Sequence, residues 1–227
     1  MTDTVTLRQM RSSARQLARP IDQLLHIAEG RLTVPMEGAA LRRPANADWA
    51  WRPPLWSAPV PGAGLAGAET TASLAEGATV FHDATGASEV TLRQLRNTRA
   101  EDLAPWGVAV EAFRFDGSFL SLVLKLPPAA LRGLTRRHVF RLEIVADRDG
   151  PATLAARANV RHGPNVAQIF QTLPADRSAA AEFDMIHTDL HESRVEDGWL
   201  EIFFNGMAMN RVVLRDVTVS RRLRAEL

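Results

Sequence analysis

The stretch Phe113 to Leu126, FRFDGSFLSLVLKL, constrains the fold of this chain more than any other. After Asp116-Gly117, leucines recur at every second position from Leu120 to Leu126, and other residue types lie between them. A period of two is typical of a β-strand with one buried face. An Asp-Gly pair between strand-like runs also favours a type I′ turn. We therefore expect a central β-hairpin with its turn at Asp116-Gly117.

Other short segments show the same alternation, and turn-forming residues separate them. We expect further strands at 78–83, 108–115, 138–146, 153–161, 166–173, 181–188, 199–204 and 211–220, whereas 90–96 fits either a strand or a helix. In the last strand the apolar parity changes near Arg215-Asp216, which indicates a β-bulge. Many short strands and few helices predict a mainly β chain that folds as an antiparallel jelly-roll-like β-sandwich, placed at residues 78–227.

Residues 1–34 form a predicted N-terminal helical segment. Its apolar positions alternate between spacings of three and four, which fits an amphipathic helix; they are Leu7, Met10, Ala14, Leu17, Ile21, Leu24 and Ala28. The helix either docks on its own domain or joins copies of the chain through residues 4–29. Pro20 predicts a break or kink in it.

Residues 35–77 form a predicted Pro/Trp-rich arm and linker. Prolines disfavour regular helix in the first part of this stretch. Trp49, Trp51 and Trp56 favour an extended arm anchored on the sandwich, with an aromatic ligand platform as the alternative. The Gly/Ala-rich residues 61–77 are expected to form a loop.

Composition excludes several classes of function. The 227 residues contain no cysteine, so disulfides, Cys-based metal sites and a Cys nucleophile are excluded. Lys plus Arg is 27 and Asp plus Glu is 26, a balance that favours no nucleic acid partner. No apolar run is long enough for a membrane span, and the N-terminus lacks the pattern of a signal peptide. The expected location is cytoplasmic, with association with a particle or envelope as the alternative.

Two resemblances follow from the motifs. From Phe113 onward, the order of SFLSLVL, HVFRLEIVA, a Trp-led strand and VVLRDVTV resembles the jelly-roll sandwich of carbohydrate-binding modules and galactose-binding-like domains. This resemblance implies a sandwich that binds a saccharide. The segments WAWRP, LRQLRNT, DGSFLSLVL, RHGPN and LRDVTVSRR make the whole chain similar to an uncharacterised alphaproteobacterial family, which implies a shared fold and no catalytic residues.

The candidate ligand-binding residues lie on one strand and in the loop after it: Arg157, Asn159, Arg161, His162 and Asn165. Arg and Asn side chains offer fixed donors to a sugar or a carboxylate. Loops on a rigid scaffold often carry function. The structural alternative is a turn whose Asn caps its own backbone.

Other polar groups are weaker candidates. His82 and Asp83 are adjacent on a strand and point to opposite faces, so a buried, hydrogen-bonded His82 is expected. His187, Asp189 and His191 alternate and would share one side of an extended chain, a spacing that fits a metal site. A structural calcium ion is also compatible with a sandwich, although no ligands are assigned to it. Four acids in mid-strand, namely Glu111, Glu143, Glu182 and Glu201, are expected on solvated faces.

These features lead to a non-catalytic binding protein for a saccharide, without an assigned metal or cofactor. One alternative is a structural or assembly subunit of an envelope or phage-like particle that oligomerises through the N-terminal helix. A further alternative is a metal-dependent hydrolase. No G-x-S-x-G, Walker A or dinucleotide fingerprint is present.

Overall fold

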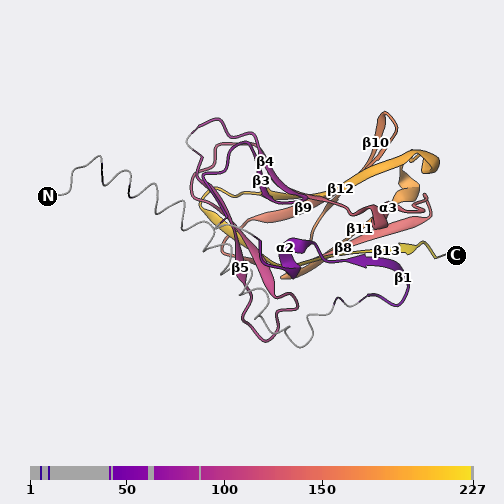
Figure 1. Cartoon of the computed structure of the whole chain (residues 1–227), viewed down its shortest axis with the longest axis horizontal. Helices are drawn as coiled ribbons and strands as arrows, with labels where there is room; N and C mark the ends of the chain where they lie inside the picture. The colour runs from indigo at the N-terminus through magenta and orange to yellow at the C-terminus, as the bar shows by residue number, and fades with distance from the viewer. Residues whose placement is uncertain are drawn as a thin grey trace.

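The computed structural model describes Thr6, Met10, Leu41 and residues 43–60, 64–86 and 88–225. The described chain folds as a jelly-roll-like antiparallel β-sandwich of two packed sheets (Figure 1). Sheet A has the order β11-β8-β13-β6-β5-β2, with β1 also paired to β13, and sheet B has the order β10-β9-β12-β7-β4-β3. The elements are β1 (Ala47–Trp51), α2 (Pro54–Ser57), β2 (Leu65–Ala66), β3 (Thr71–Ala75), β4 (Ala78–His82), β5 (Val90–Arg96), β6 (Trp106–Ala112), β7 (Leu120–Lys125), α3 (Pro128–Leu131), β8 (His138–Arg148), β9 (Thr153–His162), β10 (Asn165–Thr172), β11 (Ser178–Asp184), η1 (Met185–His187), η2 (Glu192–Arg194), β12 (Val195–Asn205) and β13 (Asn210–Leu223).

The core lies between the two sheets, and period-two alternation builds it. In β8, Phe140, Leu142 and Ile144 are buried, whereas Glu143 between them is exposed. The inward residues of both sheets belong to one hydrophobic cluster. The predicted sandwich is therefore confirmed, and the ambiguous segment 90–96 is the strand β5.

The predicted hairpin at Asp116-Gly117 is wrong. The strands on either side of it lie in different sheets, because β6 pairs with β5 and β13 whereas β7 pairs with β4 and β12. Gly117 does not have the positive φ of a type I′ turn. A Cβ atom at Gly117 would lie 2.6 Å from Asp83 Oδ1, so glycine serves a close approach between chain segments. The alternation from Leu120 to Leu126 indicates that one face of this strand is buried in the core. It does not indicate that the strand pairs with β6.

The arm belongs to the sandwich and does not lie over sheet B. β1 pairs with the C-terminal half of β13 in sheet A, and Trp49 contacts Phe140 edge to face with ring centroids 6.4 Å apart. Trp56 in α2 is completely buried, as expected for an anchor. The loop expected at 61–77 is a wrong prediction for its described part, because that part contains β2 and β3.

The β-bulge predicted near Arg215-Asp216 is confirmed by a register shift between Leu214 and Asp216 in the β13–β8 pairing. Side chains from distant segments bond the carbonyls that the bulge displaces. Trp56 Nε1 donates to Leu214 O at 2.9 Å, and Asn97 Nδ2 donates to Arg215 O at 2.8 Å. Asp216 itself forms a bidentate ion pair with Arg52 of the arm, with both N–O distances 2.9 Å.

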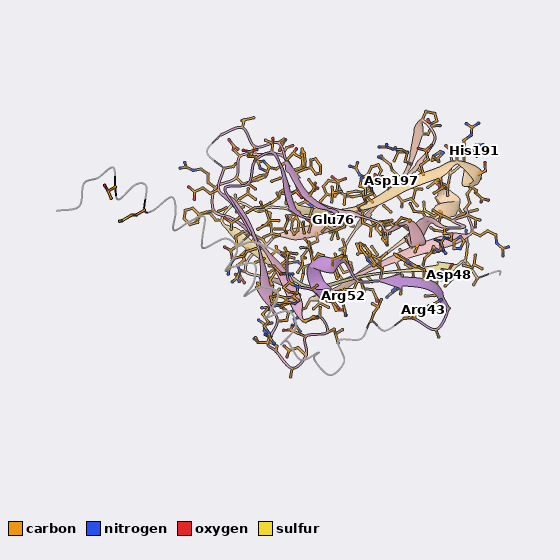
Figure 2. The ribbon with its side chains drawn as sticks, viewed as in Figure 1. Arg43, Asp48, Arg52, Glu76, His191 and Asp197 are labelled. Carbon is orange, nitrogen blue, oxygen red and sulfur yellow. The ribbon has the colours of Figure 1, made fainter. Side chains whose placement is uncertain are left out.

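A second cluster of polar side chains lies at the opposite end of β1, around Asp48 (Figure 2). Arg221 of β13 donates to the Asp48 carboxylate and to the carbonyls of Ala130 and Arg132, so it ties β1 and α3 to sheet A. His138 Nε2 lies 3.6 Å from Asp48 Oδ2. Burial raises the pKa of Asp48, but the bonds and charge of Arg221 outweigh it and hold this pKa below its usual value. Burial and the Arg221 charge lower the pKa of His138.

Most of the predicted N-terminal helix lies outside the described residues. Thr6 and Met10 are helical, and the remainder of residues 1–34 apart from these two is not described. The helix and its role in self-association therefore stay predictions. Among the described residues, no helix is long and apolar enough to cross a membrane.

Asp216→Ala should destabilise the protein strongly. The side chains of Arg52 and Asp216 are only 8% and 6% exposed, so the substitution leaves a buried guanidinium without its carboxylate. Breaking one partner of a buried pair costs about 3–5 kcal/mol. Urea unfolding measures the loss. Asp149→Ala is the control, because that side chain is 60% exposed, and it should change stability by less than about 1 kcal/mol. Equal effects of the two variants would contradict the role of the pair.

Lowering the pH from 7 to 5 should weaken the fold through His138. Its pKa in the folded chain is below the ordinary histidine value of 6.5, so the unfolded chain binds the proton more readily. The His138 contribution to stability is therefore fully present above pH 6.5 and is lost as the pH falls through the folded pKa. The Asp48 contribution is present above the ordinary aspartate pKa of 3.8 and is lost only at lower pH. Urea midpoints at pH 7, 6 and 5 should decline less in His138→Asn than in the wild type, and an equal decline in both would contradict this role of His138.

Candidate functional site

The outward face of β9 and β12 gathers polar and aromatic side chains. Strand register aligns Asn159 with Trp199, Arg157 with Glu201, and Ala155 with Phe203. Paired residues of an antiparallel ladder share a face, and their inward neighbours Ala156, Ala158, Leu200 and Ile202 are buried in the core. We call Arg157, Asn159, Arg161, Trp199, Glu201 and Phe203 the β9–β12 face.

An ion pair crosses this face. Arg157 donates to Glu201 Oε2 through Nε at 3.2 Å and through its terminal nitrogen at 2.5 Å. Ser121 Oγ of β7 donates to the other carboxylate oxygen at 2.9 Å. Glu201 is only 8% exposed, so the expectation of a solvated acid at this position is wrong. These hydrogen bonds hold the Arg157 side chain of β9 against Glu201 of β12.

Each of the two arginines lies over an aromatic ring. The Arg157 guanidinium is 5.3 Å from the centroid of Phe203, and the Arg161 guanidinium is 5.9 Å from that of Trp199. Phe170 of β10 adds a third ring, 5.9 Å from Phe203. Within the part of the chain that the structure describes, Arg161 forms no ion pair, so its charge is available to a ligand.

Asn159 lies between the two arginines along β9 and is 1% exposed. Its Nδ2 donates to the carbonyls of Arg157 and Trp199 at 3.3 and 3.5 Å. Its Oδ1 accepts no hydrogen bond from any described residue. A buried acceptor without a donor costs about 1–3 kcal/mol, which makes a water or a ligand hydroxyl a favourable partner.

The structure separates His162 and Asn165 from the three other predicted site residues. These two flank a two-residue turn, in which Gly163 has φ 63° as a type II′ turn requires. They have the parity of the inward residues of β9 and β10, and His162 is buried and accepts from His191 N at 3.3 Å. Both line a cavity of about 550 Å³ that also contacts His187 and Asp189. The turn thus divides the predicted residues between two surfaces.

The other candidate residues from the sequence are the pair His82 and Asp83, and the group of His187, Asp189 and His191. His82 is buried as expected, and its Nε2 lies 3.0 Å from Ala68 O. Asp83 instead accepts hydrogen bonds from Ser118 and Phe119, which lower its pKa. The described residues contain no group of three or more potential metal ligands, so the structure does not assemble the metal site that the spacing of His187, Asp189 and His191 would fit.

A second cavity, of about 670 Å³, lies between the arm and the end of sheet B. Its lining is mainly apolar, including Trp51, Leu55 and Leu124, and its charged residues are the exposed Glu76 and Lys125. Figure 2 labels Glu76. Few polar groups converge there to orient a ligand, unlike on the β9–β12 face.

Sequence reasoning missed Trp199, Glu201 and Phe203 as site residues. The signal was present in WLEIFF, where these three alternate with the core residues Leu200, Ile202 and Phe204. What was lacking was the pairing of β12 with β9, which places them beside Arg157 and Asn159.

Comparison with known proteins gives one family match. Residues 1–227 match a family model described as a family of unknown function, DUF6478. None of the curated proteins matches the sequence.

Several solved structures have a similar general outline. A family 11 carbohydrate-binding module from Clostridium thermocellum, in complex with a β-1,3-1,4-mixed-linked tetrasaccharide, has TM-score 0.40 and 13% identity over 72% of this chain and 97% of the module. A Stig cyclase, Fisc from Fischerella sp. TAU, has TM-score 0.45 and 11% identity over 78% of this chain and 100% of the cyclase chain. The active domain of tailspike protein 4 of bacteriophage CBA120 has TM-score 0.44 and 9% identity over 65% of this chain, which spans only 19% of the tailspike chain.

Proposed function

Because the chain belongs to DUF6478, a family of unknown function, its membership assigns no activity, and we propose that it is a non-catalytic protein that binds a saccharide. The proposed site is the β9–β12 face. The observation that carries the proposal is the combination, on one exposed sheet face, of two aromatic rings with two guanidinium groups over them.

The chemistry of a sugar suits this arrangement. A pyranose has a face of C–H groups that packs on an aromatic ring, and a rim of hydroxyls that needs donors and acceptors. Trp199 and Phe203 offer the rings, while the guanidinium groups of Arg157 and Arg161 offer hydrogen-bond donors beside them. Binding sites commonly combine aromatic area with a few placed polar groups. Binding by stacking and hydrogen bonds needs no catalytic residue.

Charge favours an acidic saccharide over a neutral one. Glu201 neutralises Arg157, whereas Arg161 forms no ion pair among the residues described. Arginine binds carboxylates through two parallel hydrogen bonds. A uronic acid that stacks on Trp199 would bring its carboxylate towards Arg161. The proposed ligand class is therefore a uronic-acid-containing glycan.

A glycan array with neutral and uronic-acid oligosaccharides tests the proposal, followed by calorimetry with the best probe. Trp199→Ala should weaken binding by at least about tenfold, equivalent to about 1.4 kcal/mol. Arg161→Ala should weaken binding of acidic probes more than of neutral ones. Phe113→Ala is the control, because this ring is 66% exposed and lies in the link between β6 and β7.

Two outcomes would contradict the proposal: no binding to any probe, or affinity that Trp199→Ala leaves unchanged. Asn165→Ala decides whether the ligand reaches round the hairpin turn, since Asn165 was predicted in the site and lies beyond its edge. Full affinity in this variant would confine the ligand to the β9–β12 face.

The alternative of an assembly subunit rests on residues 4–29, of which the structure describes Thr6 and Met10. It stays a prediction. Light scattering on the full chain and on a chain without residues 1–30 tests it. The same number of chains per particle in both would contradict it.

A further inference from the structure

The outermost strands of the two sheets differ in how well they resist pairing with another chain. Free backbone groups on an edge strand attract further strands unless the edge is short, bulged or charged. β2 spans two residues. β1 and β3 span five residues each, and both contain a register shift. β11 carries Glu182 and Asp184, which pair with arginines. Each of these edges is protected.

β10 has none of these protections. It spans eight residues, NVAQIFQT, without charge or proline, and pairs with β9 in unbroken register. Phe170 is 56% exposed and Val166 is 37% exposed. In Figure 1, β10 stands out from the body of the sandwich. A long, regular, uncharged edge of this kind is an interaction surface.

The hydrogen-bond pattern shows which backbone groups of β10 are free. Leu173 N donates to Leu154 O at 3.0 Å, directly after the strand. Because bonded pairs alternate along an antiparallel ladder, Asn165, Ala167, Ile169 and Gln171 bond to β9. Val166, Gln168, Phe170 and Thr172 therefore direct their N–H and C=O groups to the free side. Within the described residues, no backbone hydrogen bond outside the β9–β10 ladder reaches these groups.

We propose that β10 pairs antiparallel with β10 of a second copy of this chain, about a two-fold axis at Gln168. In this register Gln168 lies opposite Gln168 of the other copy, and Val166 lies opposite Phe170. All of these residues have free backbone groups, so each pair exchanges two backbone hydrogen bonds. The apolar side chains pair with each other on the outer face of the joined sheet.

A second copy fits this edge because the edge is self-complementary. A strand without charge meets itself without repulsion, and moving the register by one step would place Gln168 opposite Phe170 instead of Gln168. The pairing is isologous, so it consumes the free edge of both copies and closes at two chains. It also joins the two sheets B, which places two β9–β12 faces on one continuous surface and makes binding to a repeating polymer bivalent.

The test is light scattering with size-exclusion chromatography on the full chain over a range of concentrations. The wild type should have twice the mass of one chain at high concentration. Gln168→Lys and Gln168→Glu, each alone, should have the mass of one chain, because like charges meet at the axis. An equimolar mixture of the two variants should recover the double mass. Gln171→Lys is the control on the same strand and should keep the double mass.

Gln168→Pro is a second variant, because it removes an N–H that points away from β9. It should also have the mass of one chain, with a thermal midpoint close to that of the wild type. A wild-type mass of one chain at every concentration would overturn the proposal, as would masses that grow beyond two chains. A double mass that persists in Gln168→Lys and Gln168→Pro would also overturn it and would point to residues 4–29. Failure of the mixed variants to associate would exclude this register.

Discussion

The β-bulge between Leu214 and Asp216 is the constraint on which the arrangement of sheet A depends. A bulge displaces backbone groups from the ladder, and buried groups of this kind must find other partners. Trp56 and Asn97, from segments far apart in the sequence, bond the carbonyls of Leu214 and Arg215. Gly107 admits this packing, because a Cβ atom there would lie 3.0 Å from both Asn97 Oδ1 and Leu214 O. The side chain of Arg215 bonds Asp147, and Asp216 holds Arg52.

This bulge also explains why the β9–β12 face is left open. The bonds from Arg52 and Trp56 hold the arm on sheet A, and Arg221 holds its other end through Asp48. Trp56 is buried in the core and Trp49 packs on Phe140, whereas Trp51 also lines the cavity of about 670 Å³. On the opposite sheet, Trp199 and Phe203 face outward beside β9. In the proposed function, packing of the arm on sheet A leaves the β9–β12 face to the ligand.

Much of this fold follows from alternation in the sequence, as the example of β8 shows. The parity change in β13 was sufficient to predict the bulge. Alternation records which face of a strand is buried and not which strand lies beside it, and this is why Leu120 to Leu126 suggested a hairpin that does not form. β2 and β3 were missed because they are short and weakly apolar. For the site, parity placed Arg157, Asn159 and Arg161 on one face, whereas Trp199 and Phe203 required the pairing of β9 with β12, about 40 residues apart.

The two guanidinium–ring pairs of the β9–β12 face are not equivalent towards a ligand. A sugar that stacks on either ring must displace the arginine above it, and an exposed cation–π contact stabilises by about 0.5–1 kcal/mol. Moving Arg157 also breaks its bonds to the largely buried Glu201, which adds the cost of an unpaired carboxylate. Arg161 has no such acid partner among the described residues, so it can leave Trp199 and then bond the ligand. In the proposed function, Trp199 is therefore the ring that a sugar reaches first, and Arg157 with Phe203 forms the fixed wall beside it.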